Sequence, residues 1–188
     1  MPEGNSGKPI VVTTIGFMCI GLVGWAWNLR AAGWLAAFDG FNKVTPYTLG
    51  GALLGLMAVL AFLSECTLES IIFFAYAGYI CSYSLSFSFP VNISPVADSW
   101  FLLLWAIVFF YIWLGSSRAG WTRRLFLLTA SLNILACTGS DWTHGETAQI
   151  FIHIRGYLGL LNAAIAMLIS ARSVMAQDKP TAPGAEFR

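Results

Sequence analysis

The residues of this sequence that could do chemistry are polar side chains placed inside long apolar segments. A polar or charged group within a bilayer is costly and usually faces other helices or a water-filled cavity. Such groups are therefore candidates for contacting a small polar or anionic solute. The candidates for this contact are Thr13, Thr14, Asn133, His153 and Arg155. Further polar side chains in the same segments are Tyr76, Tyr79, Ser82 and Asn162.

Arg155 and His153 lie close together near the start of the last apolar segment. Arg155 could pair with Asp141, Glu146 or a backbone carbonyl, or it could face an anion in a pathway. The structural pairing is favoured, because cationic side chains near helix ends readily extend to the interface. His153 could contact a substrate or a proton, but a packed and satisfied histidine is the more frequent case.

Thr13 and Thr14 follow Pro9, a residue suited to the first turn of a helix. In the first turns, free backbone N–H groups and the positive helix end favour a carboxylate. The alternative carries equal weight: threonine hydroxyls in a helix also bond back to carbonyls of the preceding turn.

Neither a catalytic nor a metal-binding signature is found in the sequence, and no cofactor is expected. It has no histidine pair at helical spacing, no glycine-rich phosphate loop and no nucleophile with an evident base. The lysines all lie outside the apolar segments, which disfavours a retinal Schiff base. The ten Lys and Arg residues are scattered, which argues against nucleic-acid binding. We therefore expect a protein that is not an enzyme.

Composition places the chain in a membrane. Of its 188 residues, 57% are hydrophobic and 10% are charged, and the mean hydropathy is +0.71. A soluble domain of this size contains far more charge. The apolar runs predict an all-α membrane protein with six transmembrane helices over residues 9–27, 47–64, 70–89, 100–114, 125–138 and 148–171. Residues 9–173 form this domain, between a disordered N-terminus at 1–8 and a flexible tail at 174–188 that could include residues of non-native origin.

Helix boundaries and topology follow from prolines and charges. Pro9 and Pro95 mark two helix starts, with Asp98 or Ser99 as the N-cap of the fourth helix. The two starts and the three-plus-three division are compatible with inverted repeats. Most basic residues outside the spans fall on one side of a six-span topology, which predicts cytoplasmic termini and a plasma membrane location.

Small residues suggest surfaces for close helix packing. Gly51 and Gly55 lie four residues apart, and Ala163, Ala164 and Ala166 cluster in the last segment. Such residues let two helix backbones approach closely in a bilayer. We expect these two surfaces to support a closed symmetric homo-oligomer.

Several short motifs lie mainly in the second, third and last segments. They consist of Thr14, Gly16, Phe17, Gly50, Gly51, Glu65-Cys66-Thr67, Phe73, Phe74, Tyr76, Gly78, Tyr79, Ile152-His153, Gly156-Tyr157 and Gly159-Leu160. Together they resemble the acetate/succinate transporter family, and the resemblance spans most of residues 9–172. Leu54, Ala61 and Cys66 depart from the family pattern, which indicates a divergent member.

The resemblance implies a six-helix permease or channel for small monocarboxylates, acetate first and succinate second. It implies a homo-hexamer with one pathway in each protomer. It also implies a hydrophobic constriction formed by Phe17, Tyr76 and a leucine of the fifth helix, either Leu132 or Leu128. Two alternatives stay open: a channel for a small neutral solute such as urea, and a non-transporting membrane sensor or assembly protein.

Overall fold

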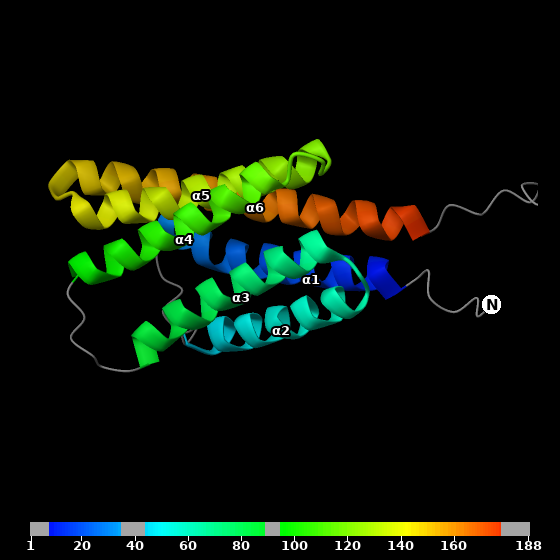
Figure 1. Cartoon of the computed structure of the whole chain (residues 1–188). Helices are drawn as coiled ribbons and strands as arrows, with labels where there is room; N and C mark the ends of the chain where they lie inside the picture. The colour runs from blue at the N-terminus through cyan, green and yellow to red at the C-terminus, as the bar shows by residue number, and fades with distance from the viewer. Residues whose placement is uncertain (1–7, 35–43, 89–94, 178–188) are drawn as a thin grey trace, which may run out of the picture.

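The computed structural model describes residues 8–34, 44–88 and 95–177, and these residues form six α-helices (Figure 1). Residues 1–7 of the predicted N-terminal segment and most of the predicted C-terminal tail lie outside the described residues, whereas Lys8 is the first residue of α1. The helices are α1 (Lys8–Ala31), α2 (Val44–Leu63), α3 (Thr67–Ser88), α4 (Pro95–Gly115), α5 (Trp121–Trp142) and α6 (Gly145–Gln177).

The six helices run up and down in one elongated bundle (Figure 1). The closest helix pairs are α1 with α6, α2 with α3, α5 with α6, and α4 with α5. The start of α1 and the end of α6 lie at the same end of the bundle, beside the α2–α3 and α4–α5 turns (Figure 1). The first and last helices of the chain are therefore neighbours, and they close the bundle. The predicted inverted repeat relation stays a prediction.

The helices are longer than the apolar runs that predicted them. The fourth begins at Pro95 rather than Trp100, so the prediction that Asp98 or Ser99 is its N-cap is wrong. Proline fits the first turn of a helix because its missing N–H would have no partner there. The fifth covers residues 121–142 rather than 125–138, and the last continues to Gln177, into the predicted tail. Hydropathy marks only the part of a helix that is immersed in lipid, whereas helical hydrogen bonding continues into the interface.

Three helices contain spans that are long and apolar enough to cross a membrane: α1, α4 and α6. Helices α2 and α3 contain shorter apolar stretches, Gly50–Leu63 and Thr67–Ser82. Helix α5 is the most polar of the six, and ten of its residues are buried against its neighbours. Large exposed apolar side chains such as Leu56, Phe74 and Tyr111 cover the outside of the bundle, as expected for a surface in contact with lipid.

Glycines allow the closest helix contacts. Gly16 of α1 lies against the Phe73 ring of α3, and Gly51 of α2 lies against the Cys81 sulfur of α3. Gly156 of α6 lies against the backbone of Ala31 and Ala32 at the end of α1. At each position a Cβ atom would overlap the neighbouring helix, so these contacts require glycine.

The small residues expected to support an oligomer are largely used within one chain. Gly51 packs on α3, Ala163 packs near Gly24, and Ala166 is fully buried. Only Ala164 of the three alanines is exposed. Gly51, Ala163 and Ala166 are therefore used for packing inside the protomer, whereas Gly55 and Ala164 keep some exposed surface, and the prediction of an oligomer stays a prediction.

Gly156 of α6 and Gly55 of α2 have different amounts of space around them, which predicts opposite effects for their substitution by alanine. Gly156→Ala should lower the free energy of unfolding by about 1–3 kcal/mol, since the new methyl group meets backbone that cannot move aside. Gly55→Ala should raise it by about 0.5–1 kcal/mol, because the helix interior gains alanine and the nearest atom, Ala77 Cβ, is 3.9 Å away. Thermal unfolding in detergent compares the two variants. Equal stability would contradict the close contact at Gly156.

Candidate functional site

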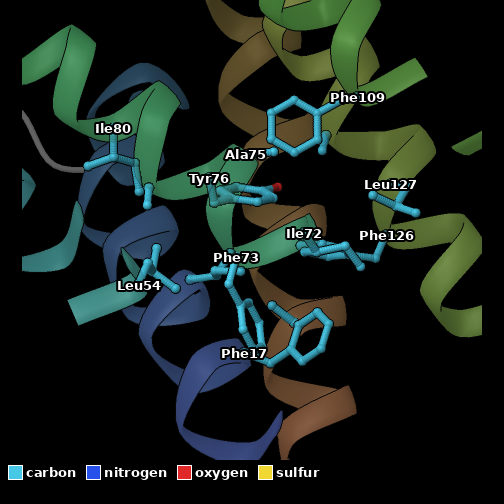
Figure 2. Close-up of a cluster of buried hydrophobic side chains, with 14 of the residues drawn as sticks. Phe17, Leu54, Ile72, Phe73, Ala75, Tyr76, Ile80, Phe109, Phe126 and Leu127 are labelled. Carbon is cyan, nitrogen blue, oxygen red and sulfur yellow. The ribbon is translucent and has the colours of Figure 1, made fainter. Parts of the chain in front are cut away.

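Five aromatic rings gather in the buried core of the bundle (Figure 2). We call Phe17, Phe73, Tyr76, Phe109 and Phe126 the aromatic cluster. Phe17 makes edge contacts with Phe73 and Phe126, at centroid distances of 5.3 and 5.2 Å. Tyr76 stacks on Phe126 at 5.5 Å and meets Phe109 edge-on at 4.7 Å. Four of the rings are fully buried, so the cluster forms part of the packed core between α1, α3, α4 and α5.

A chain of hydrogen bonds lies beside this cluster and joins three helices. The Tyr76 hydroxyl donates to Asn162 Oδ1 at 2.8 Å. Asn162 Nδ2 donates to the Phe126 carbonyl at 2.7 Å and to Thr129 Oγ1 at 2.9 Å. We call Tyr76, Asn162 and Thr129 the polar bar. All three side chains are buried, so the bar ties α3, α5 and α6 together inside the bundle.

A cavity of about 60 Å³ borders the polar bar. That volume accommodates a few water molecules or a solute of a few heavy atoms. The α1 residues that line it, from Ile20 to Asn28, follow Phe17 along the helix, so the cavity extends from the aromatic cluster toward the end of α1. The polar residues of its lining are Asn28, Tyr76, Tyr79, Asn133, Cys137 and Asn162.

Asn28 reaches the cavity because α6 has a glycine opposite it. The Asn28 carboxamide lies directly over Gly159, where any Cβ atom would overlap it. Its Nδ2 also donates to the Gly24 carbonyl at 2.7 Å, which fixes its orientation. The glycine of the Gly159-Leu160 motif therefore has a structural reason, since it makes room for a polar side chain of α1.

Asn133 is the predicted site residue that lines the cavity. Its Nδ2 donates to the backbone carbonyl of Arg155. The half-buried Arg155 side chain lies beside Cys137, another lining residue, and interacts electrostatically with Asp141. The interaction with Asp141 agrees with the structural pairing considered for Arg155, while the guanidinium also lies near the wall of the cavity.

His153, Thr13 and Thr14 do not line the cavity. His153 is exposed and lies near Gly33, at the end of α1. Thr13 is buried one turn before Phe17, and the Thr14 carbonyl accepts a hydrogen bond from Ser170 at 2.9 Å. The two threonines are therefore on the other side of the aromatic cluster from the cavity.

The expectation that Thr13 and Thr14 offer free backbone N–H groups is wrong. Helix α1 begins at Lys8, which places both threonines beyond the first turn. Only the first four N–H groups of a helix lack intrahelical partners. Any contact that these residues make with a solute would therefore involve their hydroxyl groups.

The α5 side chain that meets Phe17 and Tyr76 is Phe126. Leu132 is 41% exposed and Leu128 is half-buried, and neither belongs to the buried core. The sequence reasoning also left Asn28, Thr129 and Asn162 out of the candidate site. Asn162 had a signal, since it is a carboxamide within an apolar helix, but no pattern in one helix identifies its partners on two others.

An ion pair holds the opposite end of the bundle, near the start of α1. Arg123 of α5 contacts Glu69 of α3 at 2.6 Å, and the Glu69 side chain is only 10% exposed. Arg124 lies over the Trp113 ring at 5.7 Å, and Arg172 donates to Thr122 at 2.9 Å. Three of the basic residues that suggested the topology therefore also anchor α3, α4, α5 and α6.

No group of three or more His, Cys, Asp or Glu side chains that could hold a metal ion is found within residues 8–34, 44–88 and 95–177. The cavity instead offers amide, hydroxyl and thiol groups. Such groups can form hydrogen bonds with a small polar solute.

The different positions of Phe126 and Leu132 predict different effects of truncation. Phe126→Ala should lower the free energy of unfolding by about 3–5 kcal/mol, because it removes a fully buried ring from the aromatic cluster. Leu132→Ala should change it by less than about 0.5 kcal/mol, as expected of an exposed side chain. Unfolding in detergent, followed by circular dichroism, measures both. A larger loss at Leu132 would place the helix-5 contact where the resemblance suggested.

Comparison with known proteins identifies one fold. The structure of the bacterial acetate channel SatP superposes with a TM-score of 0.78 over 90% of this chain and 93% of that chain, at 16% sequence identity. No protein-family model matches the sequence, and no curated protein matches it. The chain therefore has the all-α membrane fold of this channel with a strongly diverged sequence. The predicted fold class is confirmed, and the resemblance noted in the motifs holds at the level of the fold.

Proposed function

We propose that this protein is a divergent member of the acetate/succinate transporter family and a membrane channel for small monocarboxylates such as acetate. The observation that carries the proposal is the cavity lined by Asn28, Asn133, Asn162 and Tyr76, which ends at the aromatic cluster. Its volume suits a solute of about acetate size. The fold shared with an acetate channel supports the same assignment.

Hydrogen-bond donors in the cavity would replace the water that a carboxylate loses on entry. Asn28 and Asn133 each use Nδ2 to bond a backbone carbonyl, and each carboxamide has a second N–H to offer. Arg155 lies beside the cavity wall and would favour an anion there. The aromatic cluster is the main barrier, because it offers a charged solute almost no polar contact.

A channel for a small neutral solute is the second candidate. The observation in its favour is that, among the residues that the structure describes, no charged side chain lines the cavity. Urea or a short amide would find the same carboxamide and hydroxyl groups without the desolvation cost of a charge. The two candidates differ in whether the solute carries a charge through the aromatic cluster.

The proposal includes a plasma membrane location, a homo-hexameric assembly and termini that face the cytoplasm. Arg118, Arg123, Arg124 and Arg172 lie at the bundle end where α1 begins, which favours this orientation. A single cysteine introduced in the loop at 116–120, in a background lacking the native cysteines, should not react with an impermeant maleimide added to intact cells. Efficient labelling would reverse the orientation.

The proposed substrate is tested by uptake into proteoliposomes. Labelled acetate should accumulate above protein-free vesicles, and unlabelled acetate should compete better than urea or succinate. The reason is that acetate fits the cavity, whereas succinate is larger and carries two charges. Preferential competition by urea would support the neutral-solute channel. Failure of every solute to cross would favour a non-transporting protein.

The variant Phe17→Ala tests whether the pathway passes through the aromatic cluster, because it should increase the flux of acetate. Removing this ring opens the aromatic cluster without touching the cavity lining, so acetate flux should rise by about tenfold or more, equivalent to a barrier lower by about 1.4 kcal/mol. Larger carboxylates should then also cross. Phe74→Ala is the control, because it also truncates a phenylalanine, but one that is 68% exposed and does not belong to the aromatic cluster. Unchanged flux in folded Phe17→Ala protein would contradict a pathway through the cluster.

A further inference from the structure

The Tyr76 side chain lies at the boundary between the cavity and the aromatic cluster. It lines the cavity, and its ring stacks on Phe126 and meets Phe109 (Figure 2). The hydroxyl donates to Asn162 Oδ1 at 2.8 Å, and Asn162 also lines the cavity. One side chain therefore belongs both to the cavity wall and to the aromatic cluster.

Asn162 is fixed so that it can only accept this bond. Both hydrogens on Nδ2 are directed to α5, one to the Phe126 carbonyl and one to Thr129 Oγ1. Thr129 is itself held, because its hydroxyl bonds back to the preceding turn through the Leu125 and Phe126 carbonyls. The Phe126 carbonyl can only accept a hydrogen bond, so the Asn162 carboxamide cannot be turned over to place its oxygen there. The Asn162 oxygen must therefore point to Tyr76.

We propose that the Tyr76–Asn162 hydrogen bond is a latch that a carboxylate opens, and that the Tyr76 hydroxyl selects carboxylates over neutral solutes of the same shape. The inference rests on the proposed function and adds its selecting residue. A carboxylate in the cavity accepts the Tyr76 O–H in place of Asn162 Oδ1. No covalent bond changes, and the hydroxyl keeps its proton throughout.

The physical basis is the difference between charged and neutral acceptors. A hydrogen bond to an ionised carboxylate is roughly twice as strong as one between neutral groups. Acetamide has the shape of acetate but offers the same kind of carbonyl that Asn162 already provides, so its exchange gains little. The latch therefore favours a carboxylate although the described lining of the cavity includes no cationic side chain.

Opening the latch also weakens part of the barrier. The hydroxyl can turn from Asn162 to the carboxylate by rotation about its C–O bond, so the ring need not leave Phe126, 5.5 Å away. Once that bond is broken, α6 no longer holds the Tyr76 ring against Phe126 and Phe109. Binding a carboxylate therefore loosens the aromatic cluster.

Two variants break the same hydrogen bond but leave different groups. Tyr76→Phe keeps the ring and removes the selecting hydroxyl. Asn162→Leu keeps a side chain of similar shape, removes the competing acceptor and leaves the hydroxyl available. Ser131→Ala is the control, since Ser131 also makes an interhelical hydrogen bond of 2.9 Å, to the Ala106 carbonyl, but does not line the cavity.

The experiment measures acetate and acetamide flux in proteoliposomes for the unmodified protein and the three variants. Asn162→Leu should raise both fluxes severalfold and keep their ratio, because the removed acceptor competed with both solutes. Tyr76→Phe should also raise acetamide flux, but the acetate-to-acetamide ratio should fall by about tenfold, the loss expected when a charge-assisted bond disappears. Ser131→Ala should change neither flux nor ratio.

The possible failures are distinguishable. An unmodified protein that conducts no acetate overturns the proposed function and this inference together, before any variant is compared. Acetate flux with an unchanged ratio in Tyr76→Phe overturns the selecting role alone. Unchanged acetamide flux in Tyr76→Phe overturns the latch, and this conservative variant decides the result even where Asn162→Leu fails to fold.

Discussion

The structure depends on one buried carboxamide. Asn162 of α6 accepts a hydrogen bond from α3 and donates two to α5, so a single side chain fixes three helices at the centre of the bundle. A polar group buried among apolar side chains requires partners, because an unsatisfied donor or acceptor costs about 1–3 kcal/mol. This requirement sets the rotation of α6 about its axis, and it holds Phe126 and Tyr76 in contact.

Glycines are the second constraint on the structure. They let the helices approach closely enough for such hydrogen bonds to form. Gly156 and Gly159 bring α6 against the end of α1, and Gly16 admits the Phe73 ring of α3 beside α1. The same close approach leaves the cavity between α1, α3, α5 and α6. These glycines, which belong to the motifs that resemble the transporter family, therefore allow close helix packing within one chain. The cavity results from that packing.

The two parts of the site have opposite chemistry. The aromatic cluster is apolar and closed, whereas the adjoining cavity has amides and hydroxyls on its walls. In the proposed channel, a solute that exchanges water for these groups would meet its main desolvation barrier at the cluster. Tyr76 belongs to both parts, which gives the cavity a direct connection to the barrier.

The sequence alone determined the fold class and the number of helices, because runs of about 20 apolar residues have few other stable arrangements. It also pointed to Phe17 and Tyr76 through the resemblance, and to Asn133 as a polar group in an apolar helix. Helix ends were predicted too short, since hydropathy reports immersion rather than hydrogen bonding. The tertiary structure alone decided that Phe126 rather than Leu132 meets Phe17 and Tyr76, and that Asn28 and Asn162 face the cavity. The physical reason is that the direction in which a side chain points depends on how its helix is rotated. Bonds between residues far apart in the sequence set that rotation, such as the bond between Tyr76 and Asn162, which are 86 positions apart.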